Sequence, residues 1–370
     1  MLTNTVLPLR SRERRQLVSP QAGTNRLTIT RILVPIDFSP ASFNALDFAL
    51  PLAERFDASV HLVHVFDFDY PSSMSAAMPM IIPESRLAQN AKRRLKDIAE
   101  KLALSPHNIH VVSGRAYRSI CELARKLGIE LIIAAASGQS ALEHVLLGST
   151  AERIVQHAAC PTLVVRGWKR SVFKKNVDAT AGRATHLRKI LIPLDFSDCS
   201  MFGLEYAILL SQASSAELVL LNSVSLPSFA PYDAYGDRGL AAANHYAWMT
   251  AEKQMSQLRS NLVARGIDAE TVIESGVPAH QICLYAQNNE VDLIVTATHG
   301  RTGLKQLPLG STAEQIVRQG RCPVLVVPCN QNSCLQPDRR GASKRDIAKF
   351  PTQTSTRRSV TTSLQRLRIR

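Results

Sequence analysis

One eight-residue stretch occurs twice in this chain, and this duplication constrains the fold more than any other feature. The first copy, GSTAERIV, occupies residues 148–155, and the second, GSTAEQIV, occupies residues 310–317. Seven of the eight residues are identical, and the copies begin 162 positions apart. Because the surrounding sequences also align, the chain contains two copies of one domain of about 140 residues, which is an ordinary domain size.

Each copy alternates apolar runs with segments of helical periodicity. Continuous apolar runs predict strands at 32–39, 59–66, 109–113, 130–137 and 160–165, and again at 190–197, 217–224, 271–274, 291–299 and 322–327. Helices are expected directly after Ser39 and Ser197, near 85–104 and 240–265, before each fourth strand, and from each GSTAE stretch. Irregular loops are expected at 67–84 and 225–237. Strands that alternate with helices predict an α/β fold: two tandem, doubly wound, parallel five-stranded sheets of the Rossmann-like type.

The net charge of +14 is unevenly distributed along the chain. Residues 1–31, 166–189 and 331–370 carry +5, +7 and +8, so the remainder carries −6. The expected organisation is a basic, disordered extension at 1–28, a domain at 29–166, a basic linker at 167–187, a second domain at 188–328 and a basic, disordered tail at 329–370. The tail is either simply solvated or makes weak, salt-sensitive contacts with nucleic acid or an anionic surface. The linker is expected to let the domains pair through their last strands.

Several chemistries lack their usual residues. The sequence has no Cys-x-x-Cys spacing and no Gly-Lys-Ser or Gly-Lys-Thr, and none of its ten histidines recurs in both copies. Ser149 and Ser311 have no His and Asp partners in matching places. The aromatic content of 5% argues against a surface that stacks nucleic-acid bases. We therefore expect no metal site and no catalytic residue.

The cysteines indicate a reducing compartment. Four of the seven occur at equivalent positions, as the pairs Cys121 with Cys283 and Cys160 with Cys322, which indicates buried core thiols. An odd count without an apolar leader favours the cytoplasm over secretion. No run of 18 apolar residues predicts a transmembrane segment.

Two kinds of residue are predicted to meet at one edge of each sheet. Asp37 and Asp195 follow the first strands, and glycine-containing loops follow the fourth strands. Ligands on doubly wound sheets bind beyond the carboxyl ends of the strands, where the strand order reverses. Either aspartate can instead cap the helix that follows it, although Ser39 and Ser197 are already placed for that purpose. We therefore favour ligand contact for Asp37 and Asp195.

The Gly-Ser-Thr stretch allows two interpretations. Gly148 and Gly310 permit close backbone approach to a phosphate, and the free N–H groups of a helix start attract anions. Alternatively, Ser149 with Glu152 and Ser311 with Glu314 are capping boxes that satisfy the helix itself. The spacing alone leaves both interpretations open.

Both domains together resemble the universal stress protein family, and the chain resembles a tandem member of it. The matching features are a first strand that ends in Pro-x-Asp, a late strand that leads to Ala-Thr-His-Gly-Arg-Thr-Gly, the Gly-Ser-Thr helix start and a Cys-Pro before the last strand. The resemblance implies the fold of the adenine nucleotide alpha hydrolase-like group. ATP-binding members share the pattern of glycine, two residues, glycine, nine residues, glycine, then Ser or Thr.

The resemblance implies one adenine-nucleotide site in each domain. In the second domain it includes Pro193, Asp195, Ser223, Ala297, His299, Gly300, Gly310, Ser311 and Thr312. In the first it includes Pro35, Asp37, Val65, Ala135, Gly138, Gly148, Ser149 and Thr150. Within these sets the aspartates would contact the adenosine part, and Val65 and Ser223 would line the adenine pocket. The first glycine of the pattern is replaced by Ala135 and Ala297, and the second domain has His299 where the first has Ser137.

These observations support a cytoplasmic stress-response protein that binds ATP, with or without Mg, or a related adenine nucleotide. It would act as a signalling or protective module rather than an efficient enzyme. The alternatives are a stress scaffold that binds no nucleotide and a slow adenine-nucleotide hydrolase. Intramolecular pairing of the two domains is expected, and a homodimer is a further candidate assembly.

Overall fold

A computed structural model describes residues 27–66, 84–137, 147–166, 187–225, 232–300 and 309–329 of the chain. Gly138, most of the linker, nearly all of both expected tails and most of the two expected loops lie outside these residues. The first half comprises β1 (Arg31–Pro35), α1 (Pro40–Phe56), β2 (Ser59–Phe66), α2 (Glu84–Lys101), a short 3-10 helix (Pro106–Asn108), β3 (Ile109–Ser113), α3 (Ala116–Leu127), β4 (Leu131–Ala135), α4 (Ser149–His157) and β5 (Thr162–Val165).

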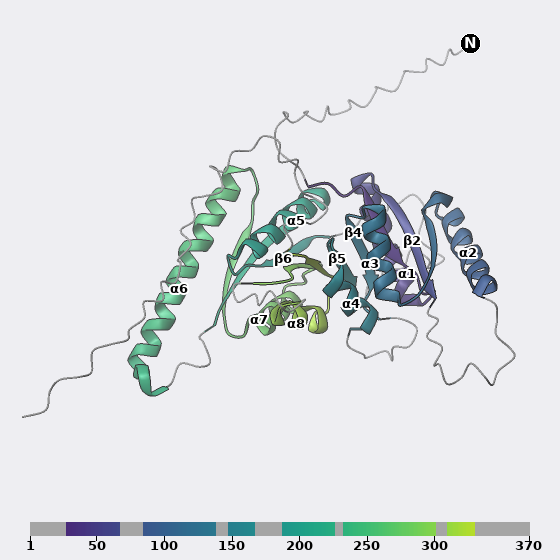
Figure 1. The fold of residues 1–370 in the computed structure, drawn as a ribbon. Coiled ribbons are helices and arrows are strands. Elements are labelled where there is room, and N and C mark those ends of the chain that lie inside the picture. The colour runs from purple at the N-terminus through teal and green to yellow at the C-terminus, as the bar shows by residue number, and fades with distance from the viewer. Residues whose placement is uncertain are drawn as a thin grey trace, which may run out of the picture. The chain divides into compact units, whose positions relative to one another are not determined.

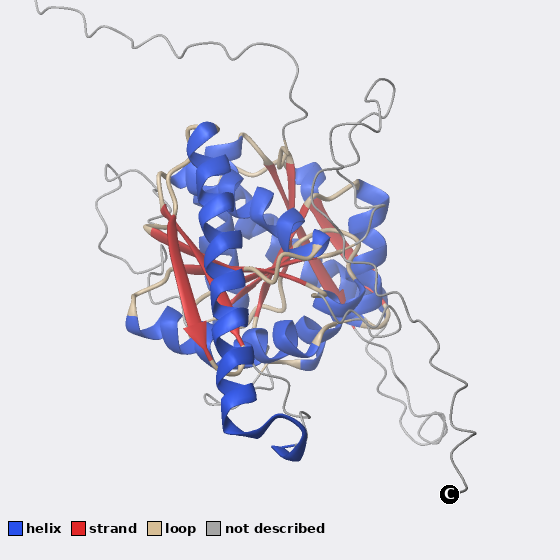
Figure 2. Cartoon of the chain, turned by 90° about the vertical axis from the view of Figure 1, so that its left-hand side faces the viewer, coloured by secondary structure: helices blue, strands red, loops and turns tan. Residues whose placement is uncertain are grey.

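The second half repeats this order. It comprises β6 (Lys189–Pro193), α5 (Asp198–Ser214), β7 (Glu217–Val224), α6 (Tyr232–Ala264), β8 (Glu270–Ser275), α7 (Pro278–Asn288), β9 (Leu293–Ala297), α8 (Ser311–Gln319) and β10 (Val324–Val327). Helices lie on both faces of the strands, with α5 on one side of β6 and with α7 and α8 on the other (Figure 1). Figure 2 shows the strands as an inner layer between helices. The predicted α/β alternation is confirmed.

The two five-stranded sheets form one continuous sheet. The strand order is β3-β2-β1-β4-β5-β10-β9-β6-β7-β8, and neighbours within each half run parallel. The expected pairing through the last strands is confirmed, because β5 and β10 pair antiparallel. The antiparallel pair directs the carboxyl ends of the two sets of strands to opposite edges of the sheet.

A local two-fold axis relates the halves at this pair of strands. Leu163 lies opposite its own counterpart, Leu325, and the flanking pairs are Val164 with Val324 and Thr162 with Val326. Ten apolar side chains line a small cavity where the halves meet, and they form five equivalent pairs: Ile29 with Leu187, Phe48 with Tyr206, Leu52 with Leu210, Leu131 with Leu293 and Leu163 with Leu325. The contact between halves is therefore self-complementary, like the interface of a two-fold dimer.

Two arginines add polar contacts across this junction. Arg166, directly after β5, donates to the carbonyls of Val317 and Arg318 at 3.0 and 2.8 Å, where α8 leaves its last carbonyls without intrahelical partners. The Arg318 guanidinium in turn lies 2.5 Å from a carboxylate oxygen of Glu152 in α4. The C-terminal turn of one half's helix is thus held by the other half.

Several predicted boundaries are wrong. The helix expected from residue 240 begins at Tyr232, so residues 232–237 are helical instead of a loop. Proline suits the start of a helix, and Pro231 directly before Tyr232 is the signal that locates this boundary. The first strands end at Pro35 and Pro193 because the following residues turn away toward the helices. Among the described residues, no helix is long and apolar enough to cross a membrane.

Candidate functional site

The turn that follows each first strand fixes an aspartate at the carboxyl edge of the sheet. In the second half, Asp195 Oδ1 accepts from the Ser197 amide at 3.0 Å and from the Ser197 hydroxyl at 2.6 Å. The equivalent distances from Ser39 to Asp37 are 2.9 and 2.5 Å. Ser39 and Ser197 are also the N-caps of α1 and α5, as expected. The aspartates therefore orient the capping serines and do not cap the helices themselves.

The residue after each aspartate has a backbone conformation that non-glycine residues rarely adopt. Phe38 has φ of 65° and Phe196 has φ of 59°. Such left-handed residues persist only where the surrounding structure imposes them, and they occur often at functional sites. The same strained turn is thus present at both predicted sites.

A cation lies near this turn in the first half. The Arg94 guanidinium of α2 lies 3.7 Å from the centre of the Phe38 ring. Arg94 directly precedes buried Leu95, and Gln254 directly precedes buried Met255 at the equivalent place on α6. The second half therefore has an uncharged residue where the first half has a positive charge. Sequence reasoning missed Arg94, because it depends on how α2 packs over the turn.

The structure brings Asp195 and Gly300 together, as predicted. A Cβ atom added to Gly300 would lie 2.4 Å from Asp195 Oδ2, which is too close for any side chain. β6 and β9 are neighbours in the sheet although they are distant in sequence, and this is the point where the strand order reverses. Any side chain at position 300 would thus displace the carboxylate or the loop. In the first half, the equivalent Gly138 lies outside the described residues.

The predicted capping boxes are wrong. Gly148 and Gly310 are the N-caps of α4 and α8, and Ser149 and Ser311 are the first helical residues. The Gly310 amide donates to the Thr298 carbonyl at 2.7 Å, and a Cβ on Gly310 would lie 3.0 Å from that oxygen. This close approach fixes glycine as the last residue before the helix and moves serine into the first turn.

The hydroxyl groups at both helix starts are therefore available at the sheet edge. Ser311, Ser149 and Thr150 are exposed, and Thr312 is half-buried. Glu152 and Glu314, which a capping box would direct back to the serine, lie instead near Arg318 in α8. The arrangement leaves each helix N-terminus with a glycine N-cap and no side-chain cap, and such free N–H groups attract anions.

Alanine at the first position of the glycine pattern fits the second half without strain. Ala297 is the last residue of β9, where the backbone is extended. A Cβ built on Gly203 of α5 would lie 4.0 Å from the Ala297 Cβ, so the methyl group faces α5. Ala135 likewise ends β4. Neither alanine occupies a position that needs a positive φ, which only glycine adopts easily.

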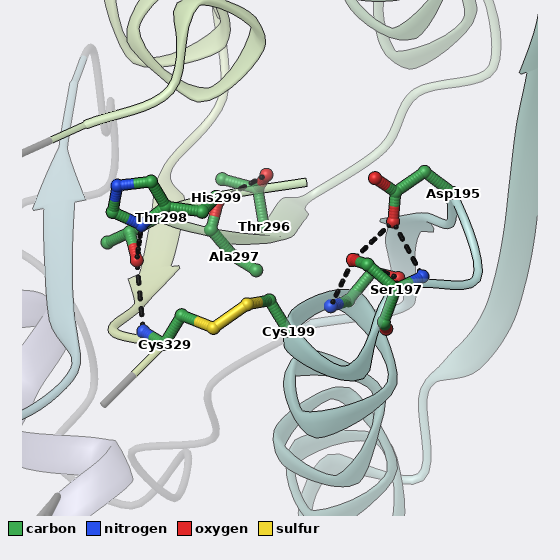
Figure 3. Close-up of a disulfide and its surroundings, with 9 residues drawn as sticks. Asp195, Ser197, Cys199, Thr296, Ala297, Thr298, His299 and Cys329 are labelled. Carbon is green, nitrogen blue, oxygen red and sulfur yellow. Dashed lines mark hydrogen bonds between the residues drawn. A yellow bond between two sulfur atoms is a disulfide. The ribbon is translucent and has the colours of Figure 1, made fainter. Parts of the chain in front are cut away.

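His299 is held by a short chain of polar contacts. Its Nδ1 lies 3.0 Å from the Thr298 hydroxyl oxygen, which accepts from the Cys329 amide at 2.9 Å. Figure 3 shows these contacts on one side of the disulfide, with Asp195 and Ser197 on the other. In the first half, Ser137 occupies the position equivalent to His299 and is half-buried.

The two residues expected to line the adenine pocket have different surroundings. Ser223, near the end of β7, donates its hydroxyl at 3.1 Å to the carbonyl of Gly276, which directly follows β8. Val65, at the matching place on β2, packs against a hydrophobic cluster. Beside them, Asn222 and His64 contact the equivalent carbonyls of Leu194 and Ile36 at 2.6 and 2.7 Å. These paired contacts fix the backbone that follows β6 and β1.

The structure contains a disulfide that sequence reasoning missed. Cys199 in α5 is bonded to Cys329 after β10, with Cα atoms 5.1 Å apart. The signal in the sequence was the lack of counterparts: Ala41 and Gly167 occupy the equivalent places in the first half. Cys199 follows β6 and Cys329 follows β10, and the carboxyl ends of these two parallel strands lie at the same edge of the sheet.

The paired cysteines of the repeat remain free thiols. Cys121 and Cys160 are buried as predicted, whereas Cys283 and Cys322 are only partly buried. Burial raises the pKa of Cys121 to about 11 and that of Cys322 to about 12. These thiols are thus protonated and unreactive at neutral pH. Within the described ranges, no three His, Cys, Asp or Glu side chains are grouped so as to hold a metal ion.

Fold and site together define a tandem doubly wound α/β protein with an aspartate, a glycine loop and an open helix N-terminus at the sheet edge. The model of the universal stress protein family matches residues 28–166 and 186–328. The chain therefore belongs to the universal stress protein family, with two copies of its domain.

Individual relatives match one domain or both. The universal stress protein MJ0531 of Methanocaldococcus jannaschii is 32% identical over 38% of this chain and 81% of its own length. Rv1996 of Mycobacterium tuberculosis is 23% identical over 82% of this chain and 96% of its own length. The crystal structure of a universal stress protein from Archaeoglobus fulgidus covers 81% of this chain and 98% of that chain, with 20% identity and a TM-score of 0.57.

Proposed function

We propose that this protein is a cytoplasmic stress-response module that binds ATP or a related adenine nucleotide, with the crevice of the second half as the principal site. The observation that carries the proposal is the approach of Gly300 to the Asp195 carboxylate, next to the start of α8, which has no side-chain cap. A carboxylate suits the hydroxyl groups of a ribose, and a helix N-terminus suits phosphates.

The corrected helix start favours binding over a purely structural role for the repeated motif. Ser311 is exposed and does not cap α8, so the helix has no evident structural need for its hydroxyl. The hydroxyl lies beside the first free N–H groups of the helix, where a phosphate oxygen would accept from both. We assign Thr312 and, in the first half, Ser149 with Thr150 the same role.

Thermal unfolding with and without Mg-ATP tests the proposal. At a free concentration 100 times the dissociation constant, ATP is expected to add about 2.7 kcal/mol to the free energy of unfolding. Ser311→Ala is expected to weaken binding while the melting temperature without ligand stays unchanged. Ser149→Ala is the matched variant of the first half and reports that site separately.

Other outcomes would favour the alternatives. If ATP, ADP and AMP all leave the melting temperature unchanged, the protein is a scaffold and not a nucleotide receptor. If Asp195→Asn abolishes ATP turnover while ATP affinity is retained, the protein is a hydrolase. Mass spectrometry of nucleotide retained through purification would identify the ligand.

A further inference from the structure

We propose that Cys199 and Cys329 are a redox-active pair, a site of thiol–disulfide exchange with low-molecular-weight thiols and disulfides, which sets the nucleotide affinity of the second half alone. The statement about affinity rests on the proposed function above. The two cysteines are 130 positions apart in sequence, and the fold places their Cα atoms 5.1 Å apart. Such a separation is in the range that a disulfide can bridge.

The disulfide spans the strand that carries the glycine loop. Cys199 is the second residue of α5, which follows β6, and Cys329 lies just beyond β10. The strand order β10-β9-β6 places β9 between these two attachment points. Thr298, His299 and Gly300 continue from the carboxyl end of β9, so the disulfide crosses the base of the predicted site (Figure 3).

Hydrogen bonds connect the disulfide to both parts of the site. The Cys329 amide donates to the Thr298 hydroxyl, while the Thr298 carbonyl accepts from Gly310, the N-cap of α8. On the other side, Cys199 lies two residues after Ser197, which binds the Asp195 carboxylate. Thr298 and Asp195 are thus each within one short contact of a disulfide-bonded segment.

The disulfide lies on the α5 face of β9, opposite the start of α8, so it restrains the predicted site without covering it. Along β9, Val295 belongs to the hydrophobic cluster that includes α5, and Ile294 belongs to the cluster that includes α8. Cys199 lies on the α5 face, whereas Ser311 lies on the α8 face. Oxidation therefore restrains one side of the predicted site, and a preorganised site binds ligand more tightly. The oxidised protein is the form with higher affinity.

The exposure of the pair favours exchange. Cys329 is exposed and Cys199 is half-buried. The thiolate of a small thiol, such as glutathione, attacks the Cys329 sulfur, the S–S bond breaks, and Cys199 leaves as a thiolate stabilised at the helix N-terminus. A second thiol attacks the mixed disulfide, which releases oxidised glutathione and the Cys329 thiolate. The two protein thiolates take up the two protons that the thiols lost.

Only the second half has this pair, because Ala41 and Gly167 stand at the equivalent positions of the first half. The first site is therefore an internal control within the same chain. The Cys199→Ala variant places at position 199 the alanine that the first half has at the equivalent position, Ala41. Because Cys334 is close to Cys329 in sequence, the experiments use the full chain with Cys334→Ser, so that Cys334 cannot replace Cys329.

The experiment titrates ATP into this protein after oxidation by glutathione disulfide and after reduction by dithiothreitol. Mass spectrometry of the oxidised protein is expected to show the peptides of Cys199 and Cys329 linked. Reduction is expected to weaken ATP binding at one of the two sites at least about fivefold. Cys199→Ala should remove this redox response, whereas Cys283→Ser, which changes a free thiol elsewhere, should retain it.

The outcomes separate this proposal from the proposed function. Equal ATP affinity in both redox states, with the linkage verified, would overturn the redox control and leave nucleotide binding intact. Absence of ATP binding in both states would overturn the proposed function and the affinity control together. In that case, amide hydrogen exchange of residues 293–300 still tests whether the disulfide restrains this segment. Faster exchange after reduction supports the restraint by the disulfide, and unchanged exchange rejects it.

Discussion

Gly203 lies in the middle of α5, and its counterpart in α1 is Ala45. A Cβ at position 203 would lie 3.6 Å from the Ile192 side chain and about 4 Å from Ala297, which are ordinary contacts. Glycine inside a helix costs about 0.5–1 kcal/mol relative to alanine. We expect Gly203→Ala to raise the free energy of unfolding by this amount in urea titrations, so an unchanged or lower value would show that α5 cannot approach β9 so closely.

The contrasting variant is Gly300→Ala. Its methyl group would lie 2.4 Å from Asp195 Oδ2, so the carboxylate or the loop must move. This variant should therefore lose nucleotide affinity, while Gly203→Ala should keep it.

A histidine pair makes the first half sensitive to acid. His61 in β2 and His110 in β3 stack, with His61 Nδ1 and His110 Nε2 3.2 Å apart. Burial lowers the pKa of both side chains, and the positive charges of His110 and Arg31 lower the pKa of His61 further. The folded protein thus favours the neutral rings. Their contribution to stability is complete above the unfolded pKa of about 6.5 and is lost as the pH falls below it.

The equivalent residues of the second half indicate which substitutions can replace the histidine pair. The strand registers place Val219 and Val272 at the positions of His61 and His110. We expect the double variant His61→Val, His110→Val to lose less stability than the parent chain between about pH 7 and pH 5. Urea midpoints at both pH values measure this difference. The same loss in both proteins would mean that the rings are protonated without cost in the folded state.

Sequence patterns predicted the positions of single residues best where the order of the strands alone determines those positions. Asp195 and Gly300 could be predicted to meet because strand order determines which loops adjoin. The disulfide partner of Cys199 and the position of Arg94 could not be derived in the same way. Both depend on how a helix packs over a turn, and periodicity does not contain that information.

At the scale of helices and strands, the two kinds of helix start differ in their capping. Ser197 caps α5 and accepts from the Ser200 amide at 3.2 Å, whereas α8 begins with Gly310 as its cap. We expect Ser197→Ala to lower the free energy of unfolding by about 1 kcal/mol. Ser311→Ala should change it by less than about 0.5 kcal/mol.

Chemical denaturation of the two variants measures both values. Ser39→Ala provides the matched control in the first half, and it should behave like Ser197→Ala. A loss for Ser311→Ala as large as that for Ser197→Ala would restore the capping box as the role of the serine.

Element boundaries followed from the sequence where a strong local signal exists. The prediction of Ser39 and Ser197 as caps is confirmed, because a residue that favours the first turn of a helix follows each of them directly. The start of α8 was shifted by one residue, because Gly310 takes the cap position through its bond to the Thr298 carbonyl. That bond joins residues from different elements, so it overrides the local preference of serine.

At the scale of the whole chain, the contact between the halves predicts how one half behaves alone. Each residue at the centre of this contact faces its own equivalent, as Leu163 faces Leu325. The second half alone, residues 187–329, would expose β10 and its share of the apolar cavity lining. We expect it to form a homodimer in which β10 pairs antiparallel with β10 of the other copy.

Light scattering coupled to size-exclusion chromatography measures this association. Leu325→Arg would place a charge against its own copy on the symmetry axis, and it should give a monomer or an unfolded chain. Leu284→Arg, at an exposed position on α7, is the control and should remain dimeric. A monomeric parent fragment would show that the covalent connection, and not the interface, holds the halves together.

The duplication in the sequence was sufficient to predict this pairing but not its register. Equivalent last strands that are both fully buried need a partner, and each other's last strand is the symmetric choice. The register depends on how α1 and α5 fit against one another, including the contact of Arg55 with the Ala213 carbonyl. Such a fit is a property of three-dimensional packing.

The two-fold arrangement has a consequence for how such a protein can diversify. In a dimer of identical chains, any substitution changes both sites at once, so a substitution that suits one site is also present in the other site. Here a single chain holds both predicted sites, and a substitution changes only one of them. The disulfide and His299 are confined to one half and Arg94 to the other, while the shared interface keeps its equivalent pairs. A tandem chain thus permits one copy to specialise while the other keeps a different set of residues.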